Sequence, residues 1–292
     1  MSEENQRIEK LMIWATRASS LVALTLVVTK FYAWFYSQSV ALFGSMLDSG
    51  LDLAASLMTL FAVKTAIQPA DEDHRFGHGK AEAIAGLFQG SLMAGSAFFL
   101  LFESGRALLA PRPSVAQDLI LGVSVFAIAL TLVLVIFQSY VIKQSNSLAV
   151  QGDHLHYMGD LMLNCSVIAS VFLANYGLTY ADGIFGFLIA GYILKGSYDV
   201  ARPSIDMLMD REVPFEERER IIQTASSVDG VKGIHEVRTR LSGRSTFIQM
   251  HIEVSGTLSV NEGHAIADLV EKALNKDFPE AETLVHIDPY QS

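Results

Sequence analysis

Six long apolar segments, separated by short polar connections, fill the first two thirds of the chain. They cover roughly residues 12–34, 38–65, 80–109, 115–142, 147–176 and 179–203. Residues 119–142 carry no charge at all, and about 20 apolar residues are enough for a helix to cross a bilayer. With such short connections, the pattern predicts a membrane α-helical fold, a bundle of six transmembrane helices over residues 1–208 in contact with lipid.

The pattern changes in residues 209–292, where fifteen acidic and nine basic residues are typical of a soluble domain. A helix is expected after Pro214, and 233–243 and 245–256 alternate like the two strands of a hairpin. An amphipathic helix over 260–278 and a short strand over 282–289 follow. The α-β-β-α-β order predicts a C-terminal α+β domain, ferredoxin-like (metallochaperone-like), with two helices on one face of a sheet.

Lysines and arginines in the short connections predict the orientation, because cytoplasmic loops are enriched in them. An even number of spans puts both ends on one side, and an N-terminus in the cytoplasm gives that face the larger share of basic residues. We therefore expect both termini in the cytoplasm. The basic residues are Arg7, Lys10, Arg17, Lys64, Arg75, Lys80, Lys143 and Arg202 on the cytoplasmic face, against Lys30, Arg106 and Arg112.

Composition and motifs exclude several function classes. A net charge of −10 argues against a nucleic-acid partner. The chain has no Gly-rich phosphate loop, nucleophile elbow or Walker-type lysine, so we expect neither an enzyme nor a nucleotide-driven pump. The single cysteine, Cys165, excludes an intrachain disulfide and any multi-cysteine metal site. Transport would then be driven by an ion gradient.

Ionisable residues inside two apolar segments form the first candidate site. Asp48 and Asp52 lie four residues apart, as do His156 and Asp160, so each pair shares one face of a helix. Such groups cost about 2.5–3.5 kcal/mol each at the centre of a membrane helix, so pairing, hydration or function is expected. One imidazole and three carboxylates suit a divalent metal ion near the membrane midplane, where carriers bind their substrates.

Two other interpretations apply to this region. The three aspartates could line a hydrated crevice, or pair with Lys30 or Lys64. His154 lies two residues before His156 and therefore points away from its face of the helix. We do not expect His154 to be a ligand.

Two groups of histidines lie outside the apolar segments. In the connection after the second segment, Asp71, His74 and His78 could close around a metal ion; the alternative is a solvated polar loop. In the C-terminal domain, strands and a helix carry four histidines and an aspartate that suit one or two zinc-type ions; the alternative is ordinary exposed histidines. These residues are His235, His251, His264, His286 and Asp288.

Several stretches together resemble the cation diffusion facilitator family. They are LDSGLDLAAS and QPADEDHRFGHGKAEAIA near the second segment, HLHYMGD in the fifth, and IHEVRTR, FIQMHIEV and VHIDP in the C-terminal domain. The resemblance implies a homodimeric, proton-coupled exporter of zinc that tolerates cadmium. It also implies a dimer-stabilising ion pair at Lys80 and Asp210. Ile287 departs from relatives that carry a polar residue there, so any ligand role at that position is absent or moved.

The resemblance further implies three metal sites. A transport site would use Asp48, Asp52, His156 and Asp160, a loop site Asp71, His74 and His78, and a two-metal cytoplasmic site His235, His251, His264, His286 and Asp288. We therefore expect a carrier in a bacterial inner membrane that exports Zn²⁺, with Cd²⁺ or Fe²⁺ as further candidates, in exchange for protons by alternating access. The rival hypothesis is a membrane-anchored metal sensor, which would need no ligands at the midplane.

Overall fold

The computed structural model describes residues 3–37, 40–109, 118–174, 176–178, 180–279 and 281–290. They form two compact units. One contains Met1–Gln68 and Ala81–Ile205, and the other contains Pro69–Lys80 and Asp206–Ser292. The connection between the second and third helices therefore belongs to the unit of the C-terminal domain, which the order of the chain does not reveal.

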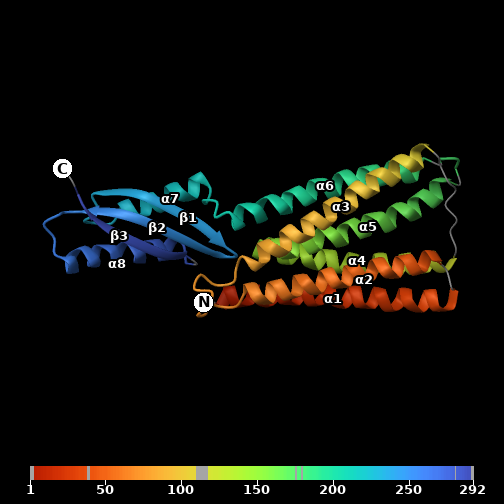
Figure 1. Ribbon diagram of the computed structural model, residues 1–292, viewed down its shortest axis with the longest axis horizontal. Helices are drawn as coiled ribbons and strands as arrows, with labels where there is room; N and C mark the ends of the chain where they lie inside the picture. Colours follow the sequence, from red (N-terminus) through yellow and green to blue (C-terminus); the bar gives the residue numbers. More distant parts are fainter. Residues whose placement is uncertain are drawn as a thin grey trace. The chain divides into compact units, whose positions relative to one another are not determined.

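Six helices form at the six predicted apolar segments (Figure 1). Helix α1 begins at Glu3, whereas the first apolar segment was predicted to start at residue 12. The apolar pattern identifies only the part of a helix that can face lipid, and the polar first turns of α1 lie outside that part. The predicted segment starts at 38, 115 and 179 lie outside the described residues. The helices are α1 Glu3–Ser37, α2 Val40–Ala66, α3 Ala81–Leu109, α4 Asp118–Ser145, α5 Leu148–Ala174 and α6 Ala181–Leu208.

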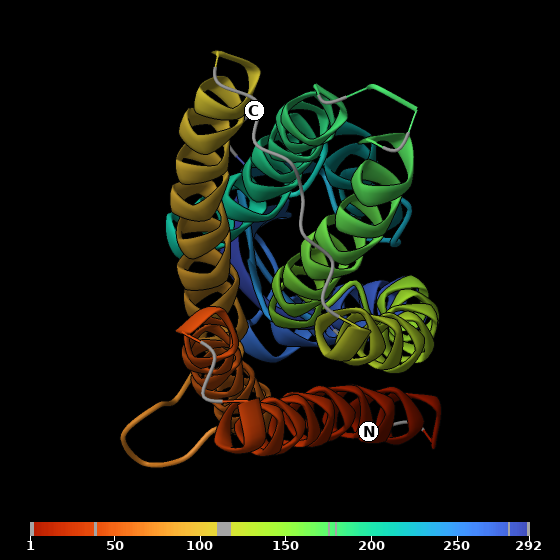
Figure 2. The same ribbon diagram turned by 90° about the vertical axis from the view of Figure 1, so that its right-hand side faces the viewer.

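Five of these helices, in the part of the chain that the structure describes, are long and apolar enough to cross a membrane: α1, α2, α3, α4 and α6. Helix α5 has 27 residues, a comparable length, but is not among the five. Large apolar side chains lie exposed along the bundle, including Leu21, Leu51 and Phe99. Contiguous apolar surface of this kind suits lipid rather than water, and Figure 2 shows the helices from one end.

Helix α5 is the helix that the others surround, since it packs against α1, α2, α3 and α4. Close approach is possible because of glycine: a Cβ at Gly152 would lie 2.8 Å from the Cβ of Gln89 on α3. Three residues further along α5, Leu155 packs with Met93 of α3 and with Ile189 and Ile193 of α6 in a buried apolar cluster. The polar residues of α5 are thereby held inside the bundle.

The second unit is built on a three-stranded sheet of order β1-β2-β3, with strands β1 Gly233–Ser242, β2 Ser245–Val254 and β3 Ala281–Pro289. The first two strands pair antiparallel as the predicted hairpin, and β3 pairs parallel with β2. A parallel neighbour needs a crossover, which helix α8, Val260–Asp277, provides.

Helices α7, Phe215–Ser226, and α8 pack against each other and against the sheet. Their buried faces share one core with the strands, in which Ile221, Val270 and Leu274 meet Ile248 and Ile252. The α-β-β-α-β order and the α+β fold class predicted from the sequence are confirmed.

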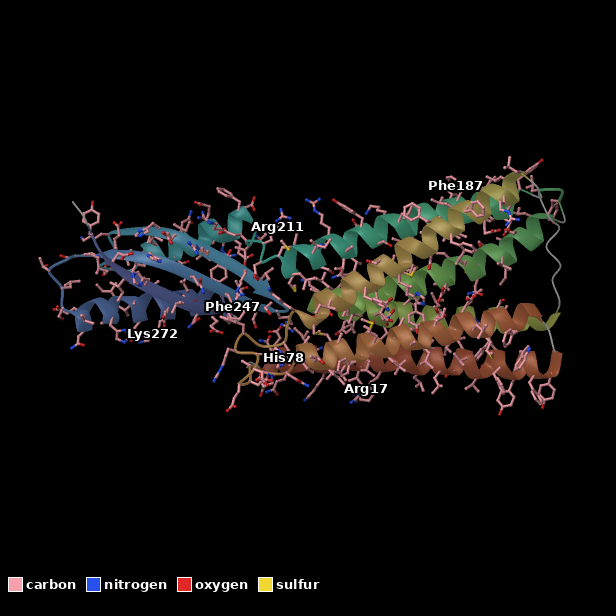
Figure 3. All side chains as sticks on the ribbon, in the orientation of Figure 1. Arg17, His78, Phe187, Arg211, Phe247 and Lys272 are labelled. Carbon is pink, nitrogen blue, oxygen red and sulfur yellow. The ribbon has the colours of Figure 1, made fainter. Side chains whose placement is uncertain are left out.

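The connection 69–80 lies on the end of this sheet. Phe76 meets Phe247 of β2 edge to face, with ring centroids 5.6 Å apart, and the guanidinium of Arg240 lies over both rings at 4.4 and 4.9 Å. Gly79 runs so close to β1 that a Cβ there would lie 2.4 Å from the carbonyl oxygen of Ser242. Figure 3 labels His78 in this connection and Phe247 on β2.

Candidate metal sites

The first site, the membrane cluster, consists of Asp52 on α2 with His156 and Asp160 on α5. One donor atom of each lies within 4.8 Å of the others. Nε2 of His156 is 2.9 Å from Oδ1 of Asp52 and 3.5 Å from Oδ2 of Asp160. His156 is only 8% exposed, whereas the two carboxylates are partly accessible.

The separation between His156 and Asp160 is close to that of two ligands of one metal ion, whereas the separation between His156 and Asp52 is shorter. Donors 2.0–2.1 Å from Zn²⁺ at the corners of a tetrahedron lie about 3.3–3.4 Å from one another. Although Nε2 of His156 is close to Asp52, it is buried without a hydrogen-bond partner of acceptable geometry among the described residues. Nε2 of His156 therefore faces two carboxylates, and Asp52 is close enough for an ion pair when the imidazole is protonated.

Contacts on the other side of the ring orient His156. Its Nδ1 lies 3.1 Å from the sulfur of Met93 on α3, and its ring meets that of Tyr157 edge to face with centroids 5.5 Å apart. Such contacts hold the imidazole so that Nε2 faces the carboxylates. Nothing in the sequence distinguishes Met93 from other apolar positions of its helix, so sequence reasoning missed it.

Asp48, the fourth predicted member, is exposed and lies outside the group of three donors. It is four residues before Asp52 on α2, hence one turn away on the same face, and it interacts electrostatically with Asp160. Lys30, offered above as a partner for the acids, donates to the hydroxyl of Ser49 at 2.6 Å and to a backbone carbonyl of α2, and it also interacts electrostatically with Asp160. His154 is not in the cluster.

The second site, the loop cluster, consists of Asp71, His74 and His78, whose donors also lie within 4.8 Å of one another. Nδ1 of His74 is 3.4 Å from Oδ1 of Asp71, and Nε2 of His78 is 3.3 Å from Oδ2. The backbone N–H of His74 donates to Asp71, and this hydrogen bond, with the nearby histidines, lowers the pKa of that carboxyl. Asp71 is therefore ionised and ready to bind a cation.

The third site, the sheet cluster, consists of His235, His251, His286 and Asp288. Strand register explains it, since His235 pairs with His251 and His251 pairs with His286 across the three strands. Asp288, two residues after His286, lies on the same face of β3. Its Oδ2 is 2.9 Å from Nδ1 of His251 and 3.3 Å from Nε2 of His235, while its Oδ1 is 3.3 Å from Nε2 of His286.

Asp288 is the centre of the sheet cluster. The hydrogen bond with His251, together with the two other histidines, lowers the pKa of its carboxyl. One carboxylate oxygen faces His251 and His235 and the other faces His286, an arrangement that would suit a ligand shared by two metal ions. The donor set, imidazole plus carboxylate at tetrahedral spacing, fits zinc. Glu253 adds a carboxylate 3.4 Å from His235. The sequence analysis did not name this residue, although its position two residues after His251 puts both side chains on the same face of β2.

His264 does not join the sheet cluster of its own chain. It is on α8, its side chain is 72% exposed, and its charged partner is Asp268, one helical turn further on, at 3.6 Å.

Lys80 and Asp210 form the predicted ion pair: Nζ of Lys80 donates to Oδ1 of Asp210 at 2.8 Å, and the guanidinium of Arg240 lies 3.6 Å from the same oxygen. The ion pair attaches the end of the 69–80 connection to the start of the C-terminal domain.

Comparison with known proteins decides the family. Residues 16–209 match the family described as the cation efflux transmembrane domain, and residues 213–290 match the cation efflux protein cytoplasmic domain. The chain belongs to the cation diffusion facilitator family. It is 45% identical over 277 residues to the cation-efflux pump FieF of Shewanella oneidensis, covering 95% of this chain and 94% of that one. The FieF of Yersinia enterocolitica is 42% identical over 277 residues, covering 94% and 92%.

The chain is also similar to solved structures that cover about a quarter of it. The zinc form of CzrB is 33% identical and covers 28% of this chain and 93% of that chain, with a TM-score of 0.26. A cadmium form of the MamM C-terminal domain is 26% identical and covers 26% and 98%, also with a TM-score of 0.26.

Family membership answers the question that the sequence left open between a carrier and a sensor. The chain is a multi-pass membrane protein and a cation efflux transporter, not an enzyme. The resemblance read from the motifs is confirmed.

Proposed function

We propose that this protein exports Zn²⁺ across a bacterial inner membrane in exchange for protons, with Cd²⁺ and Fe²⁺ as secondary substrates. The membrane cluster carries the proposal, because it presents one imidazole and two carboxylates from two helices inside the transmembrane unit. Asp48 would complete a tetrahedral set once α2 turns it toward the others. Imidazole with carboxylates is normal zinc ligation.

Proton exchange follows from the same ligands. A carboxylate or imidazole must give up its proton before it binds a metal ion, so zinc and protons compete for the same lone pairs. A site of this kind, opened first to one side of the membrane and then to the other, carries zinc outward and protons inward. No nucleotide is needed.

The loop and sheet clusters lie in the other unit, where we propose that zinc binds without being transported. Four donors of the sheet cluster come from three strands, so bound zinc would fix their mutual positions. We propose a homodimer in which His264, too remote from the cluster of its own chain, contributes to that of the partner. Lys80 and Asp210 would keep the connection and the C-terminal domain together as the dimer forms.

Transport by the purified protein in liposomes tests the proposal. A zinc-sensitive dye inside the vesicles should report uptake that is driven by an acidic interior and weakened when the pH gradient is removed. Asp160→Ala should abolish uptake, whereas Asp199→Ala, an exposed acid of α6 paired with Lys195, is the matched control and should not. Normal zinc uptake by Asp160→Ala, or uptake by the unmodified protein that does not depend on the pH gradient, would contradict the proposal.

A further inference from the structure

A second polar cluster crosses the transmembrane unit beside the membrane cluster. We call it the Asp153 cluster: Ser19 of α1, Ser56 of α2, Gln138 of α4, and Asp153 and Tyr157 of α5. The Asp153 carboxyl is fully buried, at 0% exposure. Its Oδ2 accepts a hydrogen bond from Nε2 of Gln138 at 2.8 Å, and its Oδ1 lies 3.1 Å from Oγ of Ser56.

The contacts continue beyond Ser56. Its Oγ lies 2.8 Å from the phenol oxygen of Tyr157, and that phenol donates to the backbone carbonyl oxygen of Ser19 at 3.0 Å. All five residues are buried. Three contacts in series therefore run from Asp153 through Ser56 and Tyr157 to the carbonyl of Ser19, and the cluster joins four helices.

Counting hydrogens shows what this chain of contacts requires. A carbonyl can only accept, so the one hydroxyl hydrogen of Tyr157 is used on Ser19. If Asp153 is ionised, the one hydroxyl hydrogen of Ser56 goes to the carboxylate. The two oxygens of Ser56 and Tyr157 then lie 2.8 Å apart with no hydrogen between them. If Asp153 is protonated, it donates to Ser56, Ser56 donates to Tyr157, and every contact holds one hydrogen.

The complete burial of Asp153 favours the same answer, because a charged carboxyl loses its hydration there. The hydroxyl of Ser19 also lies beside the carboxyl, but it can only add a donor to Asp153 and cannot fill the contact between Ser56 and Tyr157. The groups that face Asp153 from α1, α2 and α4 among the described residues are Ser19, Ser56 and Gln138, all neutral, and the ionisable group that acts on it from α5 is His156. His156 would favour an ionised Asp153 only while the imidazole carries a charge, which it gives up when it binds a metal ion.

We propose that Asp153 is permanently protonated and is a positioning residue, which orients α5 so that His156 faces Asp52. The inference rests on the proposed transport site. Tyr157, the neighbour of His156 in sequence and in ring contact with it, transmits the constraint. Because the hydrogen-bonded chain ends at a backbone carbonyl, the proton on Asp153 has no onward path and is not one of the protons exchanged for zinc.

Conservative substitution separates a neutral from an ionised Asp153. The amide of Asp153→Asn can donate to Ser56 and accept from Gln138, so zinc affinity and the pH profile of uptake should stay within about twofold of the unmodified protein. Asp153→Ala and Tyr157→Phe remove a member of the cluster, and each should weaken zinc binding about 10–100-fold, as loss of supporting contacts around metal ligands does. An Asp153→Asn protein as impaired as Asp153→Ala, or one with a shifted pH profile, would overturn the proposal.

Infrared spectroscopy of the full-length protein tests the protonation state without any transport measurement. The carbonyl stretch of a protonated carboxylic acid should be present at neutral pH and missing from Asp153→Asn. Ser56→Ala is a second reference, since loss of the accepting hydroxyl should shift that band. A spectrum with only carboxylate bands for Asp153 would refute the inference. If instead the band is present but Asp160→Ala transports normally, the proposed transport site fails while the protonated Asp153 stands.

Discussion

The sulfur of Met93 lies 3.1 Å from Nδ1 of His156, and Nε2 of the same ring faces Asp52 and Asp160. Only an imidazole that carries its hydrogen on Nδ1 can donate to the thioether, and that tautomer leaves the lone pair on Nε2 free for a metal ion. In the proposed transport site, Met93 would thus prepare His156 as a ligand without contacting the metal itself.

Replacing Met93 by leucine preserves side-chain volume but removes the acceptor. We expect Met93→Leu to bind zinc about tenfold more weakly, at the low end of what loss of a ligand's hydrogen-bond partner costs. Met93→Gln, which restores an acceptor, is the matched control and should recover part of the loss. Calorimetric titration of both proteins in detergent measures the effect, and equal affinities for Met93→Leu and the unmodified protein would show that the contact is incidental.

His156 should set the choice of metal. Imidazole favours Zn²⁺, whereas Mn²⁺ prefers oxygen ligands. His156→Asp converts the membrane cluster to carboxylates alone, so uptake of Mn²⁺ should rise relative to Zn²⁺ and the pH dependence of uptake should change. Competition between the two ions in liposomes checks this, and an unaltered metal profile would remove His156 from the site.

The close approach of Gly79 to β1 should be necessary for the 69–80 connection to stay on the sheet. A Cβ at this position would meet the backbone of Ser242 at 2.4 Å, and overpacking of this kind costs about 1–3 kcal/mol. We expect Gly79→Ala to expose the connection to protease and to weaken metal binding by the loop cluster. Gly256→Ala, where the added Cβ would meet its nearest neighbour at 3.6 Å, is the control.

Zinc should draw the two C-terminal domains of a dimer together. Residues 209–292 carry nine basic and fifteen acidic residues, a net charge of −6, so two copies repel each other and each bound cation reduces the repulsion. Spectroscopic labels, one on each protomer, should approach as zinc is titrated, and His251→Ala should abolish the response. If the distance between the labels does not change with zinc, or still changes in His251→Ala, the sheet cluster is a stabilising site only.

The start of α8 offers a prediction about pH. Ser259 accepts a hydrogen bond from the backbone N–H of Glu262, and the Glu262 carboxylate accepts from the backbone N–H of Ser259 at 2.8 Å. Loss of such a cap costs about 1 kcal/mol, so Ser259→Ala should speed amide exchange in the first turn of α8.

The backbone N–H of Ser259, and then its hydroxyl, lower the pKa of Glu262 below its ordinary value of 4.5. Since the folded-state pKa is the lower one, the stabilisation is complete above about pH 4.5 and is lost as the pH falls through the folded-state pKa. The protection of the first-turn amides of α8, expressed as the intrinsic exchange rate divided by the observed rate, should therefore fall at acidic pH in the unmodified protein. A profile that is flat with pH would contradict the capping role of Glu262.

The sequence predicted most of what depends on local pattern. Apolar segments located the six helices, and the spacing of four between His156 and Asp160 put both on one face of α5. Alternation placed His286 and Asp288 on one face of β3. In each case the periodicity of a helix or a strand carries the information, and that periodicity is present in any short stretch of the chain.

Contacts between distant elements could not be predicted in this way. Met93 is one of several apolar residues on α3, and only the packing of α3 on α5 brings its sulfur to His156. Asp153 was visible as an acid next to an apolar run, but its partners come from α1, α2 and α4. The attachment of the 69–80 connection to the sheet likewise depends on Gly79 and Phe76 meeting strands more than 160 residues later.

Pairing of β2 with β3 in parallel also orders the events of folding. His235 and His251 meet as soon as a local hairpin closes, which takes microseconds. Asp288 reaches them only after α8 has crossed over, a non-local step that is intrinsically slower. A nascent hairpin thus presents His235, His251 and Glu253 without Asp288, so the proposed zinc site would be complete only after the last strand has docked.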